Sequence, residues 1–130
     1  PHDVLRLHEL GAAQIISLYY SKPSGIYPAL QVAAVADACG MTCDIGGSIE
    51  MGIGVAANLH LGVSINPLRW ASVCPVPNVD GQAPVTIAGI YYMDDIISTQ
   101  IKYSEGHLRV PDGPGLGVEV DENKLARYAV

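Results

Sequence analysis

Apolar and polar residues in the first half of the chain alternate between helical and strand-like patterns. Residues 1–10 repeat apolar side chains at helical spacing, and Gly11 follows them, which predicts a helix that ends there. Residues 12–21 form a mostly apolar run, typical of a parallel strand that is covered on both faces. A second helix is predicted over 27–38 and a second, shorter strand over 41–45.

The same alternation continues beyond the second strand. A glycine-rich loop over 46–54 leads into a third apolar helix over 53–63, and 70–74 is a plausible third strand. Short connections between alternating helices and strands favour right-handed βαβ units and a parallel sheet, so the predicted fold class is α/β. Residues 75–89 are rich in turn residues and too irregular for a core element.

The tail of the chain changes character. Two short strands are predicted over 108–110 and 117–120, on either side of the turn sequence PDGPG at 111–115. Asp121 is predicted to cap a last helix over 122–128.

The stretch IGGSIEMGIGVAANLHL, residues 45–61, carries the strongest signal for a site. A strand end, a glycine-rich loop and a helix start follow one another there, which brings backbone N–H groups and the positive end of a helix dipole together. Residues 52–57 also match the dinucleotide pattern G-x-G-x-x-A. The match is incomplete, because a loop with a carboxylate, and not an apolar strand, precedes the first glycine. A dinucleotide-binding domain is therefore kept only as an alternative.

A second interpretation treats the loops after the strands as one shared rim, as in a β/α barrel. The candidate groups are Tyr19 and Ser21 from the first strand, Asp44, Ser48 and Glu50 from the second, and the segment after Cys74. The carboxylates could equally cap turns or accept backbone N–H groups.

Composition excludes several classes of protein. The 130 residues are 49% hydrophobic and 15% charged, so the chain has ample apolar surface to bury and disorder is not expected. A net charge of −6, with 7 Lys and Arg that form no cluster, argues against nucleic-acid binding. No apolar run is long enough to span a membrane. Three unevenly spaced cysteines favour a reducing compartment, and we expect a cytoplasmic protein.

Four stretches carry a resemblance to a known family: GAAQIISLYYSKPSGIYPALQVAAVADACGM, GGSIEMGIGVAANLHL, MDDI and HLRVPDGPGLGVEVDENKLARY. The chain resembles the enolase superfamily, of the mandelate racemase and muconate lactonizing enzyme type. The resemblance implies the C-terminal part of a modified (β/α)7β TIM-like barrel. Residues 1–90 would hold strands six to eight with their helices, and 91–130 would form a segment that returns to a capping domain. The start at Pro1 suggests that earlier sequence is missing.

The resemblance also implies an activity. Members abstract the proton α to the carboxylate of a small substrate, and Mg²⁺ stabilises the resulting enediolate. The three acidic Mg²⁺ ligands of the family would lie before residue 1, so no metal ligand is expected in this chain. A homo-oligomer is expected for the full-length protein, and the 130 residues alone are expected to be unstable, because an unfinished barrel leaves an open sheet edge.

Tyr19 stands where the muconate lactonizing type carries a lysine at the end of strand six, whereas Lys22 belongs to the following turn. We therefore predict Tyr19 and Glu50 as catalytic residues, and Asp44, Gly47 and Ser48 as substrate-binding residues. A tyrosine is a poor base at neutral pH, so two-base racemization is in doubt, whereas cycloisomerization or elimination remains open. The alternative is a non-catalytic relative in which the lysine has been lost.

Overall fold

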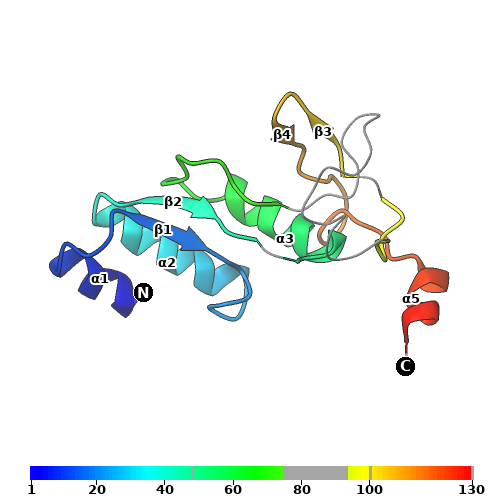
Figure 1. Cartoon of the computed structure of the whole chain (residues 1–130), viewed down its shortest axis with the longest axis horizontal. Helices are drawn as coiled ribbons and strands as arrows, with labels where there is room; N and C mark the ends of the chain where they lie inside the picture. The colour runs from blue at the N-terminus through cyan, green and yellow to red at the C-terminus, as the bar shows by residue number, and fades with distance from the viewer. Residues whose placement is uncertain (48, 75–93, 100, 130) are drawn as a thin grey trace. The chain divides into compact units, whose positions relative to one another are not determined.

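The computed structural model describes residues 1–47, 49–74, 94–99 and 101–129. The elements in chain order are α1 (His2–Glu9), β1 (Ile15–Leu18), α2 (Ile26–Ala38), β2 (Thr42–Ile45), α3 (Gly52–Val63), β3 (Tyr103–Ser104), β4 (His107–Leu108) and α5 (Glu122–Tyr128) (Figure 1). The chain forms two compact units: unit 1 is Pro1–Gly47 with His60–Val73, and unit 2 is Ser48–Leu59 with Cys74–Val130. In the part of the chain that is described, no helix is both long and apolar enough to cross a membrane.

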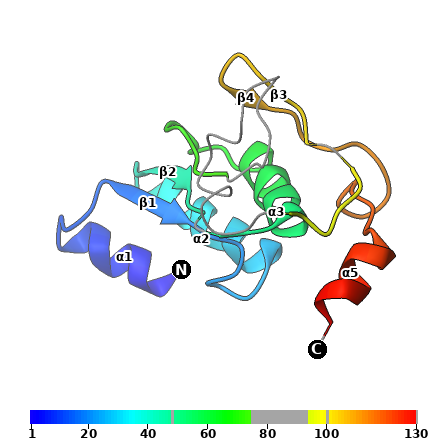
Figure 2. The ribbon, with the colours of Figure 1, turned by 45° about the vertical axis from the view of Figure 1, so that its right-hand side comes forward.

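Unit 1 is built on a parallel pair of strands. β1 and β2 pair in the register Ile15↔Thr42 to Leu18↔Ile45, and α2 connects them as a βαβ unit. Figure 2 shows α2 running alongside both strands, with α1 at the start of the chain near β1. The predicted alternation of helix and strand and the parallel pairing are both confirmed here.

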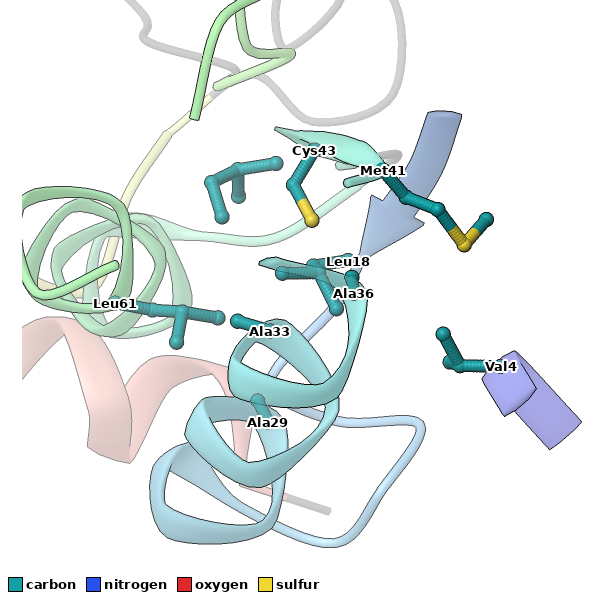
Figure 3. Packing of buried hydrophobic residues seen from close by; sticks show 9 residues of the cluster. Val4, Leu18, Ala29, Ala33, Ala36, Met41, Cys43 and Leu61 are labelled. Carbon is teal, nitrogen blue, oxygen red and sulfur yellow. The ribbon is translucent and has the colours of Figure 1, made fainter. Parts of the chain in front are cut away.

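The core of unit 1 lies between the strand pair and α2. Small side chains on one stripe of the helix, Ala29, Ala33 and Ala36, are fully buried and let the helix approach the sheet closely (Figure 3). Leu18 and Cys43 fill the space from the strands. Further buried members of this cluster are Val4, Met41, Ile45 and Leu61.

The other face of β1 is not covered by the described residues. Ile15 is 45% exposed and Ser17 is exposed, whereas Leu18 is buried. The prediction of a strand covered on both faces is therefore wrong for this structure. Side chains alternate along a strand, and within unit 1 the helical core reaches only the face that carries Leu18.

A short segment before the predicted third strand pairs with β2. Leu68 forms a parallel bridge with Cys43, whose N–H donates to the Pro67 carbonyl at 2.8 Å. Residues 70–74 form no regular strand, but the segment continues beside β2, because the Val73 N–H donates to the Ile45 carbonyl at 2.8 Å. The hydroxyl of Ser72 accepts the Ile45 N–H at 3.2 Å, where a regular ladder would use a backbone carbonyl.

Unit 2 contains an antiparallel hairpin whose position differs from the prediction. β3 and β4 pair through Tyr103↔Leu108 and turn at Glu105 and Gly106, both with positive φ. A two-residue turn of this kind matches the twist of the strands, so β4 pairs with the segment before it and not with 117–120. From that later segment, Val120 instead forms an antiparallel bridge with Ile97. The irregular stretch predicted over 75–89 lies outside the described residues.

The last helix agrees with the prediction. The Asp121 carboxylate accepts hydrogen bonds from the Asn123 and Lys124 N–H groups, both at 3.0 Å, at the start of α5. Val55 of α3 packs with Ile97 and Ile101 in the buried apolar cluster of unit 2.

Candidate functional site

The ring of Tyr19 lies across Gly46 at the carboxyl ends of the two parallel strands. Tyr19 follows β1 directly, and the Gly46 N–H extends the ladder by donating to the Leu18 carbonyl at 2.7 Å. A Cβ atom on Gly46 would overlap the Tyr19 ring, at 2.5 Å from Cζ, and would lie 2.8 Å from the Ser17 Oγ. Only glycine lets the ring take this place without displacement.

Asp44 lies on the same face of the strand pair. It is opposite Ser17 in the register, and the side chains of Ser17 and Tyr19 share a face because strand side chains alternate. The Asp44 Oδ1 atom is buried and accepts no hydrogen bond from the residues described. Asp44 also acts on its neighbour: the pKa of the Cys43 thiol is raised to about 11, first by burial and then by the charges of Asp44 and Asp37.

Lys22 brings a positive charge to Tyr19. Its Nζ lies 5.6 Å from the centroid of the Tyr19 ring, within the range of a cation–π interaction. The turn that contains Lys22 therefore bends back over Tyr19, the residue at the position where the family carries a lysine. Tyr19 itself is half-buried.

The remaining predicted residues fall in the loop after β2. Gly47 is half-buried and ends the first segment of unit 1, whereas Ser48 lies outside the described residues. The sequence pointed to Gly47 and missed Gly46, although the glycine doublet was visible, because no local pattern shows that an aromatic ring from another strand needs the space.

Glu50 belongs to unit 2, two residues before α3, and is half-buried. Its charge acts on Cys74, whose thiol has a pKa raised to about 11, first by burial and then by Glu50. Glu50 is therefore a half-buried carboxylate close enough to Cys74 for its charge to act on the thiol.

The first N–H of α3 is occupied by a carboxylate of the chain itself. The Gly52 N–H donates to Asp95 Oδ2 at 2.8 Å, and Asp95 is buried. The sequence predicted that backbone N–H groups and the positive end of a helix dipole come together here; at Gly52 the group that accepts the N–H is the Asp95 carboxylate. β2 ends at Ile45 and does not lead directly into Gly52, whose N–H is occupied by Asp95, so the structure does not support the dinucleotide alternative.

The acidic residues that the structure describes do not gather into a metal site. Among the described residues, no group of three or more His, Cys, Asp or Glu side chains could hold a metal ion. Both oxygens of Asp95 accept backbone N–H groups, and Asp94 is engaged by Lys124. These residues do not fit a Mg²⁺ cage.

Comparison with known proteins gives the fold a context. The chain is 32% identical over 128 residues to muconate cycloisomerase 1 of Rhodococcus opacus, covering 98% of this chain and 31% of the relative. It is 30% identical over 112 residues to the N-succinylamino acid racemase of Thermus thermophilus, covering 86% of this chain and 27% of the relative. The chain thus spans about a third of the length of the curated relatives that it matches.

The structural comparison agrees with the sequence comparison. The muconate lactonizing enzyme from Pseudomonas putida superposes with a TM-score of 0.81 at 28% identity, covering 99% of this chain and 33% of that enzyme. The predicted fold class, α/β of the TIM-like barrel type, is confirmed by this match. The family model described as "Enolase C-terminal domain-like" matches residues 1–124. The chain therefore belongs to the enolase C-terminal domain-like family, and within it to the mandelate racemase and muconate lactonizing enzyme type.

Proposed function

We propose that this chain works as part of a Mg²⁺-dependent isomerase or lyase that abstracts the proton α to the carboxylate of a small organic, sugar or amino acid. Relatives that are named as a cycloisomerase and as a racemase support the reaction class. The observation that carries the proposal for this chain is the placement of Tyr19 and Asp44 on one face of the strand pair, at and beside the carboxyl ends where barrel enzymes hold their catalytic groups.

In this proposal Tyr19 acts as a hydrogen-bond donor or acid and not as a base. A phenol O–H is a hydrogen-bond donor, so it can donate to a negative charge that develops on the substrate. The ring is pressed against Gly46, and the Lys22 ammonium lies above it. Contacts of this kind restrict the ring to few orientations, which favours a directed hydrogen bond.

Asp44, Gly47 and Ser48 are proposed to contact the substrate, and Glu50 to orient it. Asp44 Oδ1 is a buried acceptor without a donor in the described residues, and a hydroxyl or ammonium group of a substrate would satisfy it. Such a contact favours a substrate that carries a donor near its carboxylate.

The proposal assigns the Mg²⁺ ligands to residues outside this chain. In the family the metal supplies charge stabilisation for the enediolate. The described residues do not fit that role, so their proposed contribution is limited to binding, orienting and donating a hydrogen bond. A homo-oligomer with a cytoplasmic location is proposed as well; the three cysteines are free thiols, as a reducing compartment favours.

Exchange of the substrate α-proton with solvent tests the proposal. The protein in its natural length would be incubated with Mg²⁺ and panels of small carboxylic acids in D₂O, and deuterium incorporation would be followed by NMR. We expect exchange with at least one acid, and a loss of about 10²-fold or more in Tyr19→Phe, which keeps the ring but removes the hydroxyl. Failure to exchange any α-proton, together with failure to bind Mg²⁺, would exclude the proposed reaction.

A non-catalytic role is the second candidate, and one observation favours it. The Tyr19 ring fills the space beside Gly46 as a packing side chain would. In that case Tyr19→Phe changes no activity, because there is none to lose. Tyr19→Lys distinguishes the two candidates further: it would create α-proton exchange in a protein that otherwise has none only if the rest of the catalytic machinery is intact.

A further inference from the structure

The carboxylate of Asp95 holds the first residue of α3. Asp95 is 7% exposed, and its Oδ2 accepts the Gly52 N–H at 2.8 Å while its Oδ1 accepts the Ile97 N–H at 3.3 Å. A buried carboxylate that accepts two backbone N–H groups is fixed in orientation and favours the positive end of the helix dipole. The contact joins residues 43 positions apart, so it is no local turn.

Packing around this hydrogen bond prevents the helix start from shifting. A Cβ atom on Gly52 would overlap the Ile97 side chain, at 2.5 Å from Cγ1, and would lie 3.0 Å from Asp95 Oδ2. Ile97 is itself buried beside Val55 in the apolar cluster of unit 2. The backbone of Gly52 therefore lies directly against the segment that carries Asp95.

That segment is held in turn by the C-terminal helix. The Lys124 ammonium donates to Asp94 Oδ1 at 2.7 Å and to the Asp95 carbonyl at 3.0 Å. The Asp121 N–H donates to the Ile96 carbonyl at 2.8 Å. The two adjacent acids thus have separate tasks: Asp94 binds α5, and Asp95 binds α3.

We propose that Asp95 is a positioning residue for Glu50, and that α5 supports it through Lys124. Glu50 lies two residues before Gly52, so an amide held at Gly52 fixes the direction in which the loop with Glu50 leaves the helix. This inference rests on the proposed function only for the assignment of Glu50 to the site. The positioning itself is a property of unit 2.

Cys74 provides a measurement of where Glu50 lies. The pKa of the Cys74 thiol is raised to about 11, first by burial and then by the negative charge of Glu50. The effect of a charge weakens with distance, so a Glu50 that moves away lets the Cys74 pKa fall. A change at Asp95 could also alter the Cys74 pKa directly. Repeating the measurement without the Glu50 charge separates this direct effect from an effect that acts through Glu50.

The experiment follows the rate of alkylation of Cys74 by iodoacetamide against pH, in the protein of natural length, with peptide mapping by mass spectrometry. Asp95→Asn is compared with the wild type, and the same comparison is repeated in a Glu50→Gln background. Hydrogen exchange of the Gly52 amide is measured by NMR in each protein. Cys43, which is fully buried, serves as the control for an intact fold because it should stay unmodified at neutral pH.

We expect Asp95→Asn to move the alkylation midpoint of Cys74 to lower pH when Glu50 is present and to move it less, or not at all, with Glu50→Gln. Exchange of the Gly52 amide should become about tenfold faster, because asparagine replaces a charged acceptor of two N–H groups by a neutral amide with one acceptor oxygen. Lys124→Met keeps the Asp95 carboxylate and should shift Cys74 in the same direction by less. Equal shifts in both backgrounds, or none in either, would overturn the proposal. None of these measurements uses enzymatic activity, so failure here is distinct from failure of the proposed reaction.

Discussion

Tyr19 occupies the space in which a side chain of Gly46 would stand. The two residues directly follow the neighbouring parallel strands β1 and β2, and the Gly46 N–H donates to the carbonyl of Leu18, the residue before Tyr19. Backbone pairing and ring packing therefore determine each other at this edge of the sheet.

This relationship predicts the effect of Gly46→Ala. The added methyl group must displace the Tyr19 ring, and overpacking of this kind destabilises a fold by about 1–3 kcal/mol. Equilibrium denaturation of the protein in its natural length measures the loss. Repeating Gly46→Ala in a Tyr19→Ala background is the control: a penalty that stays the same size would show that the ring is not the cause.

A pair of glycines in α3 should respond to alanine in opposite ways. Gly52→Ala meets the buried Ile97 side chain, and we expect a loss of about 1–3 kcal/mol in the free energy of unfolding. Gly62→Ala meets only ordinary contacts, with Ile45 Cγ1 at 3.5 Å and Leu68 Cδ2 at 3.8 Å, so the better helix propensity of alanine should stabilise by about 0.5–1 kcal/mol. Equal effects at the two positions in chemical denaturation would contradict the close approach at Gly52.

The Asp94–Lys124 pair predicts a dependence of stability on pH. The hydrogen bond from Lys124 lowers the Asp94 pKa below its ordinary 3.8, and Asp94 raises the Lys124 pKa above 10.5. Because the pKa of Asp94 is lowered in the folded state, its ionised carboxylate stabilises the fold above about pH 3.8. This stabilisation is lost as the pH falls through the pKa of Asp94 in the folded protein. Because the pKa of Lys124 is raised in the folded state, its ammonium group stabilises the fold below about pH 10.5. This stabilisation is lost as the pH rises through the pKa of Lys124 in the folded protein.

Lys124→Met should therefore lower the unfolding free energy most between these limits. Outside them the difference from the wild type should become smaller, although at low pH the wild type keeps the hydrogen bond from Lys124 to the Asp95 carbonyl. Both side chains are about a third exposed, at 34% and 27%, so water and salt screen the pair and the difference should shrink in high salt. Thermal unfolding at a series of pH values tests this. A difference between the two proteins that is constant with pH would mean that the charges do not contribute.

Removal of the cap on α5 gives a fourth prediction. Asp121→Ala leaves the Asn123 and Lys124 N–H groups without their acceptor and should cost about 1 kcal/mol. Asp121→Asn retains an acceptor oxygen and should lose less. If both variants unfold at the wild-type denaturant concentration, the cap does not contribute to stability.

Local sequence signals located most of the helices and the parallel strand pair. Helix α2 ends where Gly40 follows it, and α5 begins at the residue that Asp121 caps, because both signals act within a few residues. The hairpin was misplaced because the turn sequence PDGPG looked stronger than Glu105–Gly106, although only the latter joins two paired strands.

The parts of the candidate site that escaped the sequence depend on distant residues. Asp94 and Asp95 are visible as an acidic pair before two isoleucines, but nothing nearby shows that Asp95 reaches Gly52. The same holds for the ring of Tyr19 and the space beside Gly46. Packing between segments determines where they approach closely, and this cannot be predicted from the sequence of one segment alone.

The Asp94–Asp95 doublet also has a consequence for the order of folding. Its contacts close one loop of 43 residues back to Gly52 and another of 30 residues forward to Lys124. The chain loses conformational entropy when a long loop closes, and the contacts compensate for this loss only once they have formed. Contacts of this kind therefore form late in folding. Synthesis from the N-terminus adds to this delay: the loop with Glu50 is made early but can take its final form only after residue 124 has left the ribosome.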